Sequence, residues 1–224
     1  MIKIALDGPS GSGKSSVAKA VSKKLGIVYV DTGALYRSVG YYVKTQGKDP
    51  KNAEAVSALL PEINLDVKYE NGVQCVYLNG ENLGDKIRQP EISMYASAVS
   101  AIPAVREFLL EAQKSIARKN NVIMDGRDIG TVILPDAEVK IFMTASNEAR
   151  AMRRYKELIA KNVEVKYEDV LREMIERDEN DRSRSVAPAV PADDAVIFDN
   201  SEYDLEASIE KVLEIIKEKV GEIK

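Results

Sequence analysis

Short apolar runs alternate along the chain with stretches of helical periodicity. The runs are typical of strands buried on both faces of a sheet, and they cover residues 2–7, 27–30, 122–125, 139–143 and 195–198. Between them, apolar residues recur every three or four positions, which predicts helices at 13–25, 33–45, 52–60, 91–100, 104–118, 146–161, 167–181 and 205–220. Because strands and helices alternate, we predict an α/β fold with a doubly wound parallel sheet.

The segment 61–90 shows a two-residue periodicity instead. Apolar side chains occupy alternate positions over 63–69 and again over 73–77, which is typical of strands with one buried face. A turn signal at 70–72 joins them, so the segment is a predicted β-hairpin. We therefore expect a small β insert at 61–95 and a core formed by residues 1–60 and 96–224.

The most specific local pattern follows the first predicted strand. Residues 8–15 read Gly-Pro-Ser-Gly-Ser-Gly-Lys-Ser and match the phosphate-binding pattern G-x-x-x-x-G-K-[ST] between a strand and a helix. Its glycines let backbone N–H groups face phosphate oxygens, its lysine reaches the β- and γ-phosphates, and its last serine ligates Mg²⁺. The competing interpretation is a Gly/Ser-rich turn with a solvated lysine. The predicted ATP-binding residues are Gly8, Ser10, Gly11, Ser12, Gly13, Lys14, Ser15 and Ser16, with Ser15 as the metal ligand.

Composition excludes several mechanisms and partners. The 224 residues include no histidine, so Ser-His-Asp and Cys-His catalysis and His-based zinc sites are excluded. Cys75 is the one cysteine, which rules out an internal disulfide and fits a reducing compartment. Met1 leads straight into an apolar run, and no stretch approaches the roughly 18 apolar residues of a membrane span, so we expect a cytoplasmic protein. A net charge of −4 argues against nucleic-acid partners, and we expect a monomer without membrane partners.

A phosphate-binding loop leaves three classes of protein to compare. A GTPase switch carries D-x-x-G and N-K-x-D segments, and neither occurs in this sequence. A motor or transporter subunit is usually larger and carries elements that face partners, whereas the additional length here forms a hairpin and arginine-rich helices. A small-molecule kinase is the remaining class.

Arginine is concentrated in one part of the chain. Eight of the twelve arginines lie between residues 127 and 184. A guanidinium grips phosphate through two parallel hydrogen bonds, and phosphoryl transfer needs such contacts on both donor and acceptor. The competing interpretation is a solvated helix face with charged partners such as Glu157. It applies above all to Arg150, Arg153 and Arg154.

Three polar segments are harder to assign to a solvated surface. Residues 31–37 place a hydroxyl at a helix start and an arginine one turn later. Residues 125–128 follow a buried strand, and ligands gather at the carboxyl ends of such strands. Arg177, Asp181 and Arg184 share one helical face if their helix persists.

Together with the phosphate-binding loop, these segments resemble bacterial cytidylate kinases over essentially the whole chain. The matching stretches also include Tyr95-Ala96-Ser97, Arg106, residues 125–131 and residues 186–194. The resemblance implies ATP-dependent phosphorylation of CMP or dCMP in pyrimidine nucleotide metabolism. It also implies a three-layer fold with a parallel central sheet, the hairpin insert on the acceptor side, and a helical lid at about 150–184.

The resemblance further implies roles for single residues. The acceptor phosphate would be held by Arg37, Arg127 and Arg184. Three residues would recognise cytosine, namely Ser97, Arg106 and Asp128. The carboxylate would accept from the amino group of the base, while the arginine and the serine would donate to its carbonyl and ring nitrogen. The remaining acceptor-site residues are Thr32, which keeps the hydroxyl of the serine found in some relatives, and the ribose-binding pair Arg177 and Asp181. The implied catalytic residues are Lys14, Arg127, Arg153, Arg154 and Arg184, of which Arg153 and Arg154 belong to the lid.

Several interpretations stay open. The acceptor could be UMP, or CMP and UMP equally, and a regulatory module could bind ATP without turnover. Asp125 either orients the water shell of Mg²⁺ or caps the glycine turn. Asn200 follows Asp199, where the family pattern places Ser or Thr, and we expect only a local packing cost.

Overall fold

The computed structural model describes residues 1–70 and 72–221, which form two compact units. The first unit combines Met1–Ile27 with Asn121–Lys224, and the second unit is Val28–Asn120. Within the described ranges, no helix has both the length and the apolar composition that crossing a bilayer requires.

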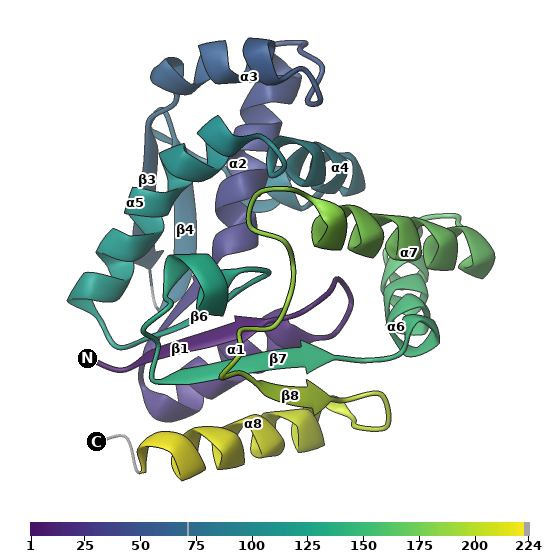
Figure 1. Cartoon of the computed structure of the whole chain (residues 1–224). Helices are drawn as coiled ribbons and strands as arrows, with labels where there is room; N and C mark the ends of the chain where they lie inside the picture. The colour runs from purple at the N-terminus through teal and green to yellow at the C-terminus, as the bar shows by residue number, and fades with distance from the viewer. Residues whose placement is uncertain (71, 222–224) are drawn as a thin grey trace. The chain divides into compact units, whose positions relative to one another are not determined.

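A parallel sheet forms the centre of the first unit (Figure 1). In spatial order its strands are β6 (Val122–Gly126), β1 (Lys3–Asp7), β7 (Val139–Thr144) and β8 (Val196–Asp199). Each strand pairs with its neighbour in parallel. Ile4, Ala5 and Leu6 of β1 are completely buried, as a continuous apolar run predicts for a central strand. The predicted parallel α/β architecture is therefore confirmed.

Four helices of the first unit fall into two pairs. Helices α1 (Lys14–Leu25) and α8 (Leu205–Val220) pack on each other and on the sheet, α1 on β1 and β6 and α8 on β7. Helices α6 (Asn147–Ala160) and α7 (Tyr167–Ser183) lie beyond the carboxyl end of β7 (Figure 1). A long segment then returns from α7 to β8.

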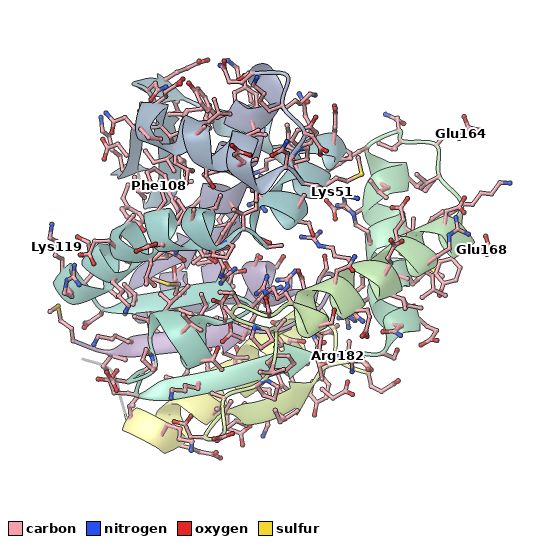
Figure 2. All side chains as sticks on the ribbon, turned by 45° about the horizontal axis from the view of Figure 1, so that its top comes forward. Lys51, Phe108, Lys119, Glu164, Glu168 and Arg182 are labelled. Atoms are coloured by element: carbon pink, nitrogen blue, oxygen red, sulfur yellow. The ribbon has the colours of Figure 1, made fainter. Side chains whose placement is uncertain are left out.

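The α6–α7 pair has an apolar contact of its own. The rings of Tyr155 and Tyr167 meet edge to face with centroids 6.1 Å apart. Glu164 lies in the turn between the two helices, and Arg182 lies near the end of α7 (Figure 2). The predicted lid at about 150–184 coincides with this pair, while its closure stays a prediction.

The second unit combines helices with a small antiparallel sheet. Its sheet strands are β3 (Leu65–Glu70), β4 (Val73–Leu78) and β5 (Glu81–Asn82). Strand β3 pairs antiparallel with β4, which confirms the predicted hairpin. The predicted turn at 70–72 includes Asn71, which lies outside the described residues. The other elements are β2 (Val28–Asp31), α2 (Thr32–Thr45), α3 (Ala53–Leu59), η1 (Leu60–Glu62), η2 (Gly84–Arg88), α4 (Pro90–Val99) and α5 (Pro103–Lys119).

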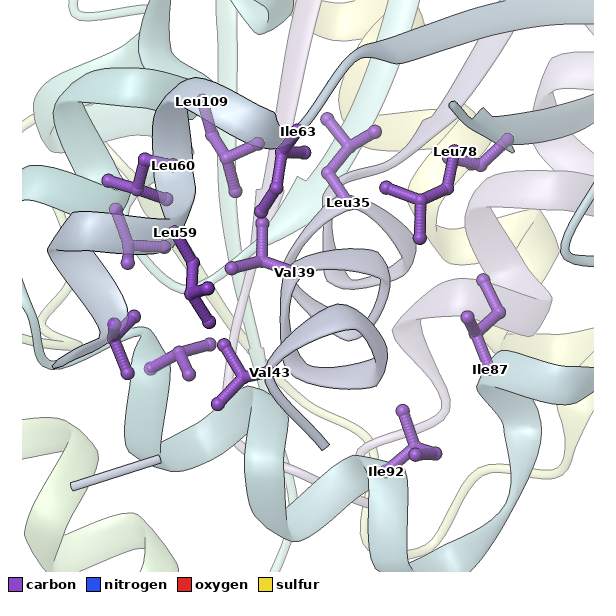
Figure 3. Packing of buried hydrophobic residues seen from close by; sticks show 14 of the residues in the cluster. Leu35, Val39, Val43, Leu59, Leu60, Ile63, Leu78, Ile87, Ile92 and Leu109 are labelled. Atoms are coloured by element: carbon purple, nitrogen blue, oxygen red, sulfur yellow. The ribbon is translucent and has the colours of Figure 1, made fainter. Parts of the chain in front are cut away.

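Helix α2 is central to the core of the second unit. Leu35, Val39 and Val43 are buried along one face of α2, at the four-residue spacing visible in the sequence (Figure 3). At Gly40 the backbone of α4 comes so close that an added Cβ would lie 2.9 Å from the nitrogen of Ala96. The small residue thus sets the distance between α2 and the helix that carries Ser97.

The compact unit that contains the hairpin is longer than the predicted insert, because it spans Val28–Asn120 and includes α2 and α5. The independence of residues 61–95 stays a prediction. Among the described residues, four short elements have no separate counterpart in the sequence prediction: η1, β5, η2 and the π-helix η3 (Ile129–Ile133).

Candidate active site

The phosphate-binding loop leaves β1 and enters α1, as the sequence predicts. Gly8 and Gly13 have φ angles of 150° and 86°, a region that residues with a side chain rarely adopt. At Gly8 the constraint is also steric, since a Cβ would lie 2.0 Å from the carbonyl oxygen of Met143 in β7. Glycine is therefore required where the loop passes close to the backbone of β7.

Arg150, which lies on α6, holds one carbonyl group of this loop by a hydrogen bond. Its Nη1 donates to the carbonyl oxygen of Ser10 at 2.8 Å and pairs with Oδ2 of Asp178 at 2.5 Å. Because C=O and N–H point in opposite directions across a trans peptide, the N–H of Gly11 is directed away from Arg150. Arg150 is 3% exposed, so the interpretation of this residue as part of a solvated helix face is wrong.

Lys14 is buried at the start of α1, and its Nζ donates to the carbonyl oxygen of Pro9 at 3.0 Å. Burial, followed by the positive charge of Arg127, lowers the pKa of Lys14 to about 7, and Asp125 only partly offsets them. The phosphates of a nucleotide would supply the negative charge that favours the protonated amine. The surroundings of Lys14 are thus suited to an anionic ligand.

A hydrogen bond joins Ser15, in the first turn of α1, to Asp125. The Ser15 hydroxyl donates to Oδ2 of Asp125 at 2.6 Å. Asp125 lies in β6, next to β1 in the parallel sheet, and its side chain is buried at the carboxyl end of that strand. A hydroxyl beside a carboxylate fits Mg²⁺, which prefers oxygen ligands and keeps several waters. The neighbouring Ser16 is exposed on the first turn of α1.

Asp7 is a buried carboxylate that the sequence interpretation missed. Its two oxygens accept from the backbone N–H groups of Ile129 and Gly130, each at 2.8 Å. Burial raises the pKa of Asp7 to about 7, although both hydrogen bonds act in the opposite direction. Asp7 ties the end of β1 to the segment that carries Arg127 and Asp128.

A charged cluster lies where β6 ends and α7 ends. Nε of Arg127 donates to Oδ2 of Asp181 at 3.0 Å. Nitrogens of Arg184 lie 3.7 Å from Oδ1 of Asp181 and 3.8 Å from Oδ1 of Asp128. Burial opposes ionisation of Asp181, but Arg127, Arg177 and Arg184 outweigh it and hold its pKa below the ordinary value.

The condition for a shared helical face, that the helix persists as far as Arg184, is not met. Helix α7 ends at Ser183, and Arg184 follows in an extended conformation with ψ of 142°. Its Nε donates to the carbonyl oxygen of Ala187 at 2.5 Å. The extended backbone still brings Arg184 close to Asp181, so the proximity predicted from the spacing is correct.

In the second unit, Asp31 and Arg37 form the predicted polar start of α2. Oδ1 of Asp31 accepts from the N–H of Ala34 at 2.9 Å and caps the helix, while Oδ2 pairs with Nη2 of Arg37 at 2.8 Å. Thr32 is buried in the first turn. Arg88, absent from the predicted site, lies 3.9 Å from Oδ2 of Asp31 and is mostly exposed.

The predicted base-reading residues of the second unit lie on α4 and α5. Ser97 is half-buried on α4. Arg106 is buried on α5, where Nη1 donates to the carbonyl oxygen of Ser100 at 3.1 Å and the guanidinium lies 5.5 Å from the ring centre of Tyr36. The contact with Tyr36 is a cation–π interaction, and it limits the orientations open to the guanidinium.

The family model described as cytidylate kinase matches residues 4–218. The chain belongs to the cytidylate kinase family. It is 50% identical over 217 residues to the cytidylate kinase of Fervidobacterium nodosum, an alignment that covers 97% of each protein. It is 46% identical over 220 residues to that of Caldicellulosiruptor saccharolyticus, covering 98% of this chain and 97% of the relative. Among solved structures, a shikimate kinase from Bacteroides thetaiotaomicron aligns over 96% of this chain and 98% of its own, with 14% identity and a TM-score of 0.48.

In this cytidylate kinase family member, the two predicted lid arginines have different surroundings. Nη1 of Arg153 donates to the carbonyl oxygen of Ser12 at 3.3 Å and to Oδ1 of Asn200 at 3.2 Å. Arg154 pairs with Glu157 at 2.8 Å near the helix surface, as the competing interpretation expects. Neither contact tests a role in catalysis, which stays a prediction for both.

The site residues predicted from the resemblance to cytidylate kinases are found in both compact units. Thr32, Arg37, Ser97 and Arg106 belong to the second unit, and the others belong to the first. Asp7, Arg88, Arg150 and Asn200 were not among them. Asp7 had a detectable signal, since a charged residue at the end of a buried strand needs a partner.

Proposed function

We propose that this chain transfers the γ-phosphoryl group of ATP to CMP or dCMP, releasing ADP with CDP or dCDP. The observation that carries the proposal is the charged cluster of Arg127, Asp128, Asp181 and Arg184 in the first unit. Asp125, two residues before Arg127, accepts from the Ser15 hydroxyl at 2.6 Å, so the cluster adjoins the end of the phosphate-binding loop. Together with membership of the cytidylate kinase family, this supports a kinase rather than a nucleotide binder.

The donor would bind as its Mg²⁺ complex. Ser15 would ligate the ion, and Asp125, which already accepts from the Ser15 hydroxyl at 2.6 Å, would orient its water ligands. The bound ion would neutralise charge on the triphosphate oxygens. Of the two roles predicted for Asp125, this geometry supports the one near the metal.

Catalysis by the chain's own residues rests on position and charge. The acceptor is an anionic phosphate oxygen, so no side chain has to remove a proton. Lys14 would hold the β- and γ-phosphates, while Arg127 and Arg184 would hold the acceptor phosphate in line with the donor. Asp181 contacts both of these arginines and would keep their guanidinium groups oriented. Arg153 and Arg154 would close over the transferring group.

The proposed acceptor contacts are those that the family resemblance implies. Arg37 would join Arg127 and Arg184 on the phosphate, and Thr32, Arg177 and Asp181 would contact the rest of the nucleotide. Cytosine offers an amino donor that a carboxylate can accept, together with a carbonyl and a ring nitrogen that need donors. The residues assigned to these groups are Asp128, Arg106 and Ser97.

The direct test is a coupled assay of ADP release with Mg²⁺ and ATP. The acceptors compared are CMP, dCMP, UMP, AMP, GMP and shikimate, with a reaction lacking an acceptor and the variant Lys14→Ala as controls. We expect rapid turnover with CMP and dCMP, slower turnover with UMP, and none with purine nucleotides. Turnover with another acceptor alone would contradict the base-reading assignment. ATP binding without any turnover would indicate a regulatory module.

The variant Asp128→Asn tests the choice between cytosine and uracil. It replaces a pure acceptor by a group that also donates, so turnover of CMP should fall strongly while UMP loses less. An unchanged ratio of CMP to UMP turnover would show that Asp128 does not read the base.

We further propose that the chain acts as a cytoplasmic monomer. The single cysteine supports a reducing compartment, and both substrates are small molecules that need no second protein. Light scattering of the purified chain measures the oligomeric state, and a mass near twice 24.7 kDa would contradict the monomer.

A further inference from the structure

Asn200 lies at a junction between four parts of the first unit, although it departs from the family pattern expected at this position. Its Nδ2 donates to the carbonyl oxygen of Ser12 at 3.0 Å and to Oγ of Ser208 at 3.3 Å. Its Oδ1 accepts from Nη1 of Arg153 at 3.2 Å, and its backbone N–H donates to the carbonyl oxygen of Thr144 at 2.8 Å. The residue is 3% exposed, so these contacts replace water almost completely.

The contacts require an amide rather than the hydroxyl that the family pattern predicts. The side chain must donate toward Ser12 and accept from Arg153 at the same time. A carboxylate would place an acceptor against the Ser12 carbonyl, and an aliphatic side chain would leave that buried carbonyl with the weaker 3.3 Å contact from Arg153. A serine hydroxyl is one atom too short to span both groups.

Arg153 completes the arrangement from α6. Besides its Nη1 contacts to Ser12 and Asn200, its Nη2 donates to the backbone oxygen of Asn200 at 2.7 Å. The guanidinium therefore holds both the side chain and the main chain of Asn200. Two side chains from distant parts of the sequence converge on one carbonyl group of the phosphate-binding loop.

The direction of that carbonyl determines the direction of a group that binds the donor. The Ser12–Gly13 peptide is planar and trans, so the N–H of Gly13 points away from Asn200 and Arg153. This N–H is one of those that the loop motif turns toward the phosphates. Gly13 is also close to Asn200, because an added Cβ would lie 3.9 Å from Nδ2.

We infer that Asn200 is a positioning residue of the donor site. Together with Arg153 it fixes the Ser12–Gly13 peptide so that the N–H of Gly13 faces the phosphates of ATP before ATP arrives. The inference rests on the proposed function in taking ATP as the donor, but not on the identity of the acceptor. It assigns Arg153 a contribution to donor binding in addition to any role in lid closure.

The test compares Asn200→Ala and the nearly isosteric, uncharged Asn200→Leu with the wild-type chain. Calorimetry of Mg²⁺–ATP binding without acceptor gives Kd, and steady-state assays give KM for ATP and for CMP separately. Loss of one buried hydrogen bond should raise Kd and KM for ATP roughly five- to hundredfold. KM for CMP should stay within about twofold, since none of these contacts of Asn200 is to a residue assigned to the acceptor.

Ser208→Ala is the matched control, because it removes the other partner of Nδ2 and leaves the contact with Ser12. It should lower the melting temperature without changing Kd for ATP. Arg153→Ala should weaken ATP binding, and the double variant with Asn200→Ala should lose less than the two single effects combined, because both act on one carbonyl.

An unchanged Kd for ATP in folded Asn200→Leu would overturn the inference, as would equal changes of both KM values. If Asn200→Ala does not fold, Asn200→Leu and Arg153→Ala decide. Failure of the proposed function appears differently, as absent CMP turnover in the wild-type chain, and the calorimetric comparison remains decisive in that case.

Discussion

The hydroxyl of Ser15, in the first turn of α1, lies 2.6 Å from Oδ2 of Asp125. Asp125 belongs to β6, which pairs with β1, the strand before the phosphate-binding loop. Under the proposed function, Ser15 would ligate Mg²⁺ and Asp125 would orient the water ligands of the ion. The contact therefore links the sequence motif to a chemical expectation that can be measured.

Asp125→Asn should lower turnover about ten- to hundredfold, because the group that orients the metal's ligands loses its charge. The Mg²⁺ concentration that gives half-maximal activity should rise. Ser15→Thr keeps the hydroxyl and should retain activity, whereas Ser15→Ala should resemble Asp125→Asn. An activation curve that does not move in Asp125→Asn would contradict a role near the metal.

Asp31 serves two partners with its two oxygens, and substitutions can separate them. Asp31→Ala removes the cap on Ala34 and should cost about 1 kcal/mol of unfolding free energy. Asp31→Asn keeps a capping oxygen and should lose much less, although both variants lose the charge that pairs with Arg37. Urea unfolding curves measure the difference. Equal losses in the two variants would show that the charge matters more than the cap.

Gly40→Ala should disturb both stability and acceptor binding. A Cβ at this position would lie 2.9 Å from the backbone nitrogen of Ala96 and 3.1 Å from the carbonyl carbon of Tyr95, so α4 must move away from α2. Because α4 carries Ser97, KM for CMP should rise along with a lower melting temperature, while KM for ATP should change little. Thr45→Ala, at the exposed end of α2, is the control for a general effect of substitution in this helix.

Asp7 predicts a specific pH dependence of stability. Burial raises its pKa from 3.8 to about 7 in the folded chain, so between these values the folded state binds more protons than the unfolded state. The stabilisation that protonated Asp7 contributes is therefore present at low pH and is lost as pH rises toward 7. For each pH unit in this range, the equilibrium constant of unfolding increases by at most about tenfold.

Asp7→Asn does not titrate, so its free energy of unfolding relative to wild type should increase from pH 5 to pH 7 and stay level at pH 8. The variant also loses one acceptor for the N–H groups of Ile129 and Gly130, which adds an offset independent of pH. Urea unfolding of both proteins at each pH measures the difference. Parallel curves for the two proteins would show that Asp7 keeps an ordinary pKa.

The periodicity of apolar residues predicted most helices and strands, because burial determines where apolar residues occur along each of these elements. The runs at β1 and β7 are apolar since both strands are enclosed, and the stripe of Leu35, Val39 and Val43 is buried on α2. The π-helix at Ile129–Ile133 could not be predicted in this way. It depends on Asp7, more than a hundred residues away, whose carboxylate binds its first N–H groups.

Residues of the candidate site could be predicted where a sequence motif specifies their chemistry. They could not be predicted where only tertiary packing brings them to the site. The loop motif identified Lys14 and Ser15, and the spacing of Asp181 and Arg184 indicated their proximity even though α7 ends between them. Arg150 has the same local context as Arg154, with charged neighbours on a helix. Only the tertiary structure distinguishes them, since one is buried against the loop and the other pairs with Glu157.

The discontinuity of the first unit has a consequence for the order of events during synthesis. Strand β1 leaves the ribosome before the second unit, whereas its sheet neighbours β6 and β7 follow only after the whole second unit. The loop contact with Asn200 comes later still, 188 positions after Ser12. Contacts this far apart in sequence form slowly. A nascent chain should therefore gain protection by ATP only after Asn200 has left the ribosome.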